Sequence, residues 1–129
     1  MLGSEAVTHG IRVKVRSSYS DEHSSPNDNH WFFLYTITIS NEGSQTVQLL
    51  TRHWTITDGN GATQTVYGQG VVGEQPVLEP GQSFQYTSAC PLVTDVGSMH
   101  GYYTLRGEDG EEFNADIALF TLSQAKVFH

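Results

Sequence analysis

The sequence predicts an all-β protein, an antiparallel β-sandwich of the immunoglobulin or fibronectin type III kind with about seven strands. Three observations support this fold class. Only 16% of the residues are charged, and 13 glycines punctuate a chain rich in β-branched and aromatic residues, which favours strands and turns. Apolar and polar residues alternate in several runs, and no segment has a convincing helical period. A small closed barrel is the alternative architecture.

The first predicted strand, IRVKVR, alternates strictly, and the second follows a polar connection at 18–29 and is dense in aromatic residues. The tight turn DGNG joins the third strand, in which Trp54 is the expected core anchor, to the fourth. Phe84 and Tyr86 share a face in the fifth strand, and a turn at 108–110 joins the last two. The predicted strands span residues 11–16, 30–40, 46–57, 62–67, 82–90, 98–107 and 112–122.

The length of 129 residues fits one domain, 1–129, with its core at about 8–122. Acidic residues outnumber basic ones 14 to 6, so the net charge of −8 disfavours nucleic acid and anionic membranes as partners. The single cysteine, Cys90, excludes an internal disulfide and is expected to be buried. Since the sequence shows neither an export leader nor a long apolar run, we expect a cytoplasmic protein.

The stretch YGQGVVGEQP contains Gly68, Gly70 and Gly73 in the GxGxxG spacing of dinucleotide-binding loops. In those loops the glycines turn a strand into a helix whose N-terminal amides hold phosphates. Residues 74–82, EQPVLEPGQ, do not form such a helix, and the Lys and Ser or Thr of a P-loop do not follow. A bulge or bend is therefore the first interpretation. The second is a nest of loop amides that binds an anion, which Glu74 disfavours unless a divalent cation intervenes.

The longest motif, VVGEQPVLEPGQSFQYTSACPLVTDVGSMHGYY, together with TRHWTITDGNG, resembles the ApaG family, also called CorD. The resemblance covers nearly the whole chain, with Ala89 where the family usually has glycine. It implies a fibronectin-type β-sandwich without established catalytic residues. It also implies a link to cobalt resistance, magnesium efflux and diadenosine tetraphosphate metabolism, and a role in partner recognition where the domain occurs inside larger eukaryotic proteins.

No motif supplies a nucleophile, a base and an orienting group together, so we expect neither an enzyme nor a bound cofactor. Six histidines raise the question of a metal site. The first long connection gathers acidic and imidazole side chains at Asp21, Glu22, His23, Asp28 and His30. A solvated polar loop is the preferred interpretation, because metal ligands are normally fixed on rigid elements. We therefore expect no metal.

Alternation places Arg52 and Trp54 on one face of their strand and His53 on the other. Arg52 then needs a carboxylate partner, for which Glu74 and Glu79 are candidates, or a contact with a phosphate or a protein.

Half of the basic residues form one stripe on the first predicted strand, and an acidic group lies near the end of the chain. The basic stripe is Arg12, Lys14 and Arg16. The acidic group is Glu108, Asp109, Glu111, Glu112 and Asp116. We expect the stripe to be a solvated face or an edge protected by charge. Its alternatives are anion binding and pairing with the acidic group, within the chain or across a dimer.

Two hypotheses of function follow. The favoured one is a non-catalytic module that mediates protein–protein interaction through the glycine stretch and the neighbouring strand edge. The alternative is a small-molecule sensor that binds pyrophosphate or a dinucleoside polyphosphate, with or without a metal ion. The candidate binding residues are Gly68, Gly70, Gly73, Glu74, Gln75 and Arg52. The protein partner is unidentified, and a homo-oligomer is compatible with both hypotheses.

Overall fold

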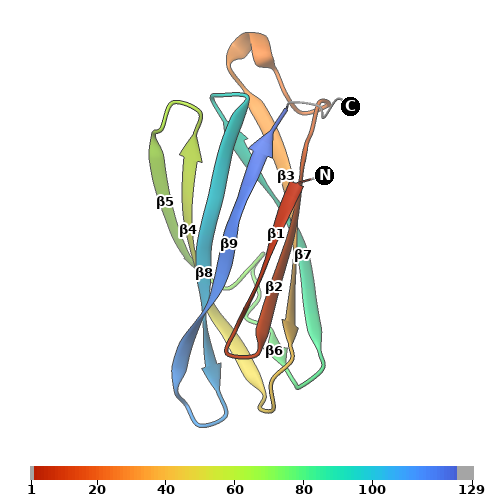
Figure 1. Ribbon diagram of the computed structural model, residues 1–129, viewed down its shortest axis with the longest axis vertical. Helices are drawn as coiled ribbons and strands as arrows, with labels where there is room; N and C mark the ends of the chain where they lie inside the picture. The colour runs from red at the N-terminus through yellow and green to blue at the C-terminus, as the bar shows by residue number, and fades with distance from the viewer. Residues whose placement is uncertain (1, 125–129) are drawn as a thin grey trace.

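Two antiparallel sheets pack face to face in a β-sandwich (Figure 1). The computed structural model describes residues 2–124, and through these run nine strands and one short 3₁₀ turn, η1 (Pro26–Asp28). The strands are β1 (Leu2–Thr8), β2 (Ile11–Tyr19), β3 (Trp31–Asn41), β4 (Val47–Asp58), β5 (Thr63–Gln69), β6 (Val77–Leu78), β7 (Ser83–Leu92), β8 (Val96–Gly107) and β9 (Glu112–Ser123). The predicted sandwich is confirmed, and the closed barrel is wrong.

One sheet has the strand order β1-β2-β3-β7, and the other has β5-β4-β8-β9, with the two-residue β6 also pairing with β4. Alternation in the sequence corresponds to alternation of burial, since Ile11, Val13 and Val15 of β2 are buried and its basic side chains face outward. The inner faces of both sheets form one hydrophobic core, in which Phe33 and Phe120 are fully buried. Each such side chain stabilises the fold by about 1.5–3 kcal/mol.

All seven predicted strands are present, but β1 and β6 were missed. The β1 sequence, LGSEAVT, contains glycine, serine, glutamate and alanine, which have little intrinsic preference for strands. Tertiary contacts hold it in place, because Ser4 Oγ donates a hydrogen bond to the Ala118 carbonyl (2.6 Å) and Thr8 Oγ1 accepts one from the Asp116 N–H (3.2 Å). The ladder with β2 and these contacts with β9 thus override the weak local preference.

The two long sides of the sandwich differ. On the closed side β1 lies next to β9, and the buried Ser17 hydroxyl is within hydrogen-bond reach of the carbonyls of Leu2 (3.4 Å) and Thr121 (2.8 Å). On the open side β5 and β7 are the edges of their sheets, and no strand of residues 2–124 pairs with their outer edges (Figure 1). Trp54, the predicted core anchor, is buried behind this open side.

Candidate functional site: a clamped loop beside an open strand edge

The glycine stretch forms a loop that leaves β5 and rejoins β4 through β6. At Leu50, β4 has a bulge relative to β8. The Leu50 carbonyl accepts hydrogen bonds from the Gly70 N–H (2.8 Å) and from Gln75 Nε2 (2.9 Å). The loop therefore satisfies the backbone that the bulge leaves unpaired.

The centre of the loop is a tight hairpin. Val71 and Glu74 exchange two backbone hydrogen bonds of 2.8 and 2.9 Å around Val72 and Gly73, which both have positive φ, as in a type I′ turn. The Val71 side chain is fully buried and anchors the hairpin in the core. The predicted helix-free turn is confirmed, and the N–H groups of Gly70, Val71 and Glu74 donate within the protein rather than converging on a common point.

Each glycine of the motif has a structural reason. Gly68 leaves room for the Arg52 guanidinium, whose Cζ lies 2.5 Å from the position of an ideal Cβ. Gly70 has a φ of 63°, and a Cβ there would overlap the Glu74 carbonyl oxygen. Gly73 has a φ of 83° and faces open space. The spacing is thus accounted for without a bound phosphate.

Arg52 extends from β4 to the loop. Its Nη1 donates to the carbonyls of Gln69 and Gly70, both at 2.9 Å. The ion pairs formed among residues 2–124 do not include Arg52 with Glu74 or Glu79, so the predicted ion pair is wrong. The guanidinium is oriented by backbone carbonyls, and within the described part of the chain no carboxylate forms an ion pair with it.

Arg52 also lines a pocket of about 270 Å³ between the two sheets, on the open side. The other lining residues are Tyr35, Trp54, Ile56, Gln64, Val66, Ser88, Ala89, Cys90, Pro91 and Met99. Burial raises the pKa of Tyr35, while a hydrogen bond with Ser88 and the charge of Arg52 act in the opposite direction. We call this space the intersheet pocket. It combines an apolar floor with one cationic group.

Two further tyrosines are buried in the core. The hydroxyls of Tyr86 and Tyr103 share a hydrogen bond of 2.5 Å. Burial is the main cause that raises the pKa of both side chains, so both stay neutral at physiological pH. Cys90 is buried, as predicted, and burial raises the pKa of its thiol to about 11. A thiol in this state is a poor nucleophile.

Sequence reasoning missed an aromatic cluster on the outer face of the β5-β4-β8-β9 sheet. His53 stacks on Tyr102, with ring centroids 4.2 Å apart and an interplanar angle of 14°, and the ring centroid of Tyr67 lies 4.7 Å from that of the same imidazole. The cluster borders a groove of about 580 Å³ that also includes His100 and Asp116. Tyr67 on β5 is 67% exposed, so an aromatic ring stands beside the open edge.

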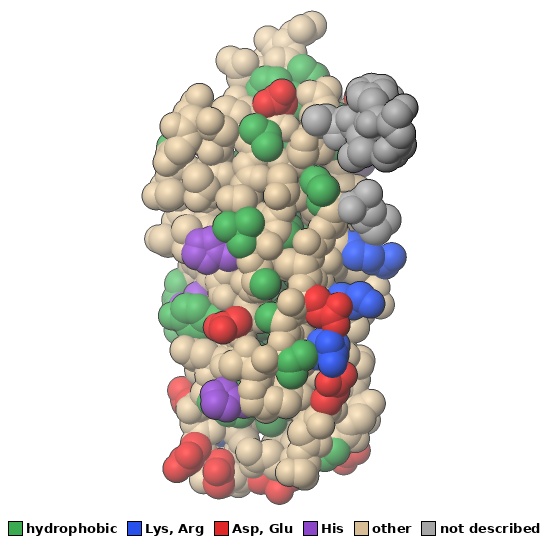
Figure 2. All heavy atoms as spheres, viewed as in Figure 1, with side chains coloured by type: hydrophobic (Ala, Val, Ile, Leu, Met, Phe, Trp, Pro, Cys, Tyr) green, Lys and Arg blue, Asp and Glu red, His purple; other side chains and the backbone are tan. Residues whose placement is uncertain are grey.

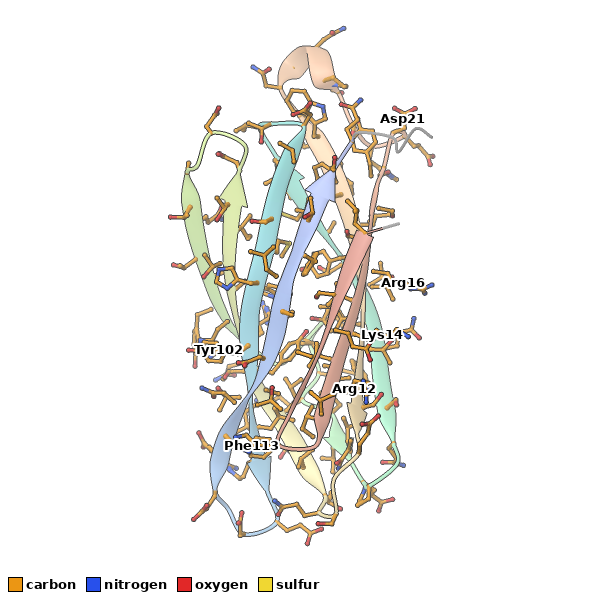
Figure 3. All side chains as sticks on the ribbon, in the orientation of Figure 1. Arg12, Lys14, Arg16, Asp21, Tyr102 and Phe113 are labelled. Carbon is orange, nitrogen blue, oxygen red and sulfur yellow. The ribbon has the colours of Figure 1, made fainter. Side chains whose placement is uncertain are left out.

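The basic stripe points outward from β2 (Figure 3), and acidic side chains lie among its basic ones at one side of the molecule (Figure 2). Arg12 forms ion pairs with Glu5 and with Glu42, the latter at 2.8 Å, and its hydrogen bonds lower the pKa of Glu42. Within the acidic group, Glu112 pairs with Arg106 of the neighbouring strand at 3.3 Å. Pairing of the stripe with the acidic group inside the chain is therefore wrong.

The first long connection packs its imidazoles against an aromatic ring. His23 hydrogen-bonds Ser20 Oγ through Nδ1 (2.8 Å), and both His23 and His30 lie against Phe32. In the part of the chain that the structure describes, no three His, Cys, Asp or Glu side chains are grouped so that they could hold a metal ion. That same part also contains no helix long and apolar enough to span a bilayer.

Fold and site together define a small β-sandwich domain in which a glycine hairpin clamps the edge of one sheet. The family model of the ApaG domain matches residues 21–107, and the chain belongs to the ApaG family. Protein ApaG of an Azoarcus species is 48% identical over 98% of this chain and 99% of its own length. Protein ApaG of Methylobacterium radiotolerans is 54% identical over 95% of both chains. The crystal structure of an ApaA protein from Bordetella pertussis has a TM-score of 0.88 at 45% identity, covering 91% of this chain and 95% of that one.

Proposed function

We propose that the protein is a non-catalytic module that binds another protein through the β5 edge and the hairpin beside it. The observation that carries this proposal is the composition of β5, TQTVYGQ, which contains no charged residue and no proline. Natural sheets normally protect exposed edges with such residues or by covering them. The β7 edge carries Pro91, and β1 and β9 cover each other, whereas β5 has neither protection. An unprotected edge is the expected feature of a surface that pairs with a partner.

The aromatic cluster supports the same surface. Tyrosine is enriched in protein interfaces, and Tyr67 stands exposed on β5 itself. The links to divalent cation homeostasis and dinucleoside polyphosphate metabolism, which we include in the proposal, would then act through a protein partner. We place this role in the cytoplasm, because the only cysteine, Cys90, is buried and unpaired.

Affinity capture from a lysate of the native host tests the proposal. The bait is the purified protein, compared with a Tyr67→Glu variant on β5 and a Leu119→Glu variant on β9, where the original side chain is 57% exposed and far along the sheet from β5. We expect a partner that wild type and Leu119→Glu retain and Tyr67→Glu loses. Identical capture by all three baits would refute the proposal.

The sensor hypothesis is tested separately by thermal shift with pyrophosphate, ATP and diadenosine tetraphosphate, each with and without Mg²⁺ or Co²⁺. A ligand at about 100 times its Kd stabilises the fold by about 2.7 kcal/mol. We expect no shift, because the loop amides of Gly70, Val71 and Glu74 already donate within the protein. A shift that Gly70→Arg abolishes would favour the sensor.

A further inference from the structure

We propose that the partner binds as an additional β-strand along β5 and places a carboxylate against Arg52. This inference rests on the proposed function and names its class of partner, an extended segment with an acidic side chain. Strand addition of this kind gains affinity from the backbone and specificity from pockets for alternate side chains. Both components are found at the β5 edge.

The backbone component follows from the register of β5. At its two ends, the Asp58 N–H donates to the Ala62 carbonyl (3.0 Å) and the Gly70 N–H donates to the Leu50 carbonyl (2.8 Å). Hydrogen-bonded and non-hydrogen-bonded pairs alternate in an antiparallel ladder. The backbone N–H and C=O groups of the even-numbered residues between these ends therefore point toward β4. The backbone groups that point away from β4, toward the open side, are those of Thr63, Thr65, Tyr67 and Gln69, and of these the Gln69 carbonyl already accepts a hydrogen bond from Arg52.

The side-chain component is the intersheet pocket, which opens under the same edge. Gln64 and Val66 of β5 line it, and so does Arg52. A strand added beyond β5 directs every second side chain toward this space. A carboxylate at such a position would meet a guanidinium that has only carbonyl partners among the described residues. Arginine and carboxylate form strong charge-assisted hydrogen bonds, so the charge selects an acidic side chain.

A second copy of this chain fits the edge less well. Pairing of β5 with β5 would direct alternate side chains of TQTVYGQ to the pocket, and no residue of this strand carries a carboxylate. Each copy also has a net charge of −8. The charge of Arg52 therefore favours a different chain as the occupant.

The test uses two blocked synthetic heptapeptides, acetyl-TVTETVT-amide and acetyl-TVTQTVT-amide, which differ only in the central side chain. Binding to the ¹⁵N-labelled full chain is followed by amide chemical shifts and by hydrogen exchange. With nine tenths of the protein bound to the Glu peptide, we expect exchange at Thr63, Thr65 and Tyr67 to slow by about tenfold, while residues facing β4 change little. The Glu peptide should bind about threefold to tenfold more tightly than the Gln peptide.

Two variants provide the controls. Arg52→Gln should remove the difference between the peptides, and Thr65→Pro should remove binding of both, because a proline at an outward-facing position blocks the edge without breaking the β4 ladder. If either variant fails to fold, the exchange pattern of the wild type decides alone. Equal affinity for the two peptides, no binding at about 5 mM peptide, or shifts confined to another strand would overturn the proposal. Slower amide exchange along β5 at higher protein concentration, without any peptide, would also overturn the proposal, because it would identify a second copy of the chain as the occupant.

The two proposals can fail separately. If a partner is captured in a way that depends on Tyr67 but the peptides do not bind, the proposed interaction module stands and the proposed strand addition is refuted. If capture is unchanged by Tyr67→Glu, both proposals are refuted.

Discussion

Replacement of Gly70 by alanine is predicted to destabilise the domain far more than the same replacement of Gly73, although both glycines have positive φ. The values are 63° at Gly70 and 83° at Gly73, where an L side chain costs about 1–2 kcal/mol. The surroundings distinguish the two positions. A new Cβ at Gly70 overlaps the Glu74 carbonyl oxygen, whereas one at Gly73 meets nothing within 4 Å.

The expected magnitudes follow from these contacts. Relief of the overlap at Gly70 moves Glu74 away from Val71 and breaks the two backbone hydrogen bonds that close the hairpin, each with a net value of about 0.5–1.5 kcal/mol. Gly70→Ala should then lower the free energy of unfolding by about 2–5 kcal/mol, and Gly73→Ala by about 1–2 kcal/mol. For a domain of this length, 1 kcal/mol corresponds to a Tm change of about 3–5 °C.

Urea denaturation and calorimetry of the two variants and the wild type measure the difference directly. Gly73→Ala is the matched control, because it introduces the same methyl group with the same sign of φ. Equal losses of stability would refute the reasoning, since they would show that the loop relaxes around a Cβ at Gly70 at no cost. The glycine spacing would then need an explanation other than the clamp on β4.

Three further predictions concern the core and the hairpin. The neutral buried thiol of Cys90 contributes stability that is complete below its ordinary pKa of 9.0 and is lost as pH rises toward 11, so Cys90→Ala should flatten the urea midpoint between pH 9 and 11; parallel curves would contradict this. Tyr86→Phe and Tyr103→Phe should each cost about 1–3 kcal/mol, because each leaves a buried hydroxyl unpaired, and the double variant should cost less than their sum; additive losses in the double-mutant cycle would exclude the coupling. Val72 has a φ of 43°, so Val72→Gly should raise the free energy of unfolding by about 1 kcal/mol, and a lower Tm would show that the valine is not strained.

The strands that carry both sheets could be predicted from the sequence because their alternation reports burial directly. In β2, for example, the apolar positions are the buried ones. β1 could not be predicted in this way, because its residues have weak strand preference and its place depends on contacts with β9. Local sequence does not encode the contacts with β9, which lies about a hundred positions away.

The candidate site was predictable in part. The prolines after Gly73 excluded the helix of a dinucleotide-binding loop, and the structure contains a hairpin there. The partner of Arg52 could not be predicted, because backbone carbonyls leave no signature in a sequence and every residue supplies one. The stacking of His53 and Tyr102 depends on the register between β4 and β8, which alternation within one strand does not determine.

The contact between β1 and β9 limits when this domain finishes folding. Ser4 and Ala118 are joined across 114 positions, so during synthesis from the N-terminus β1 and β2 are made long before β9, which covers them. Pairings of such long range slow folding, and sandwiches dominated by them fold in milliseconds to seconds. In the nascent chain β1 and β2 therefore lack their contacts with β9 until synthesis is nearly complete. The closed side is the last part of the domain that can assemble.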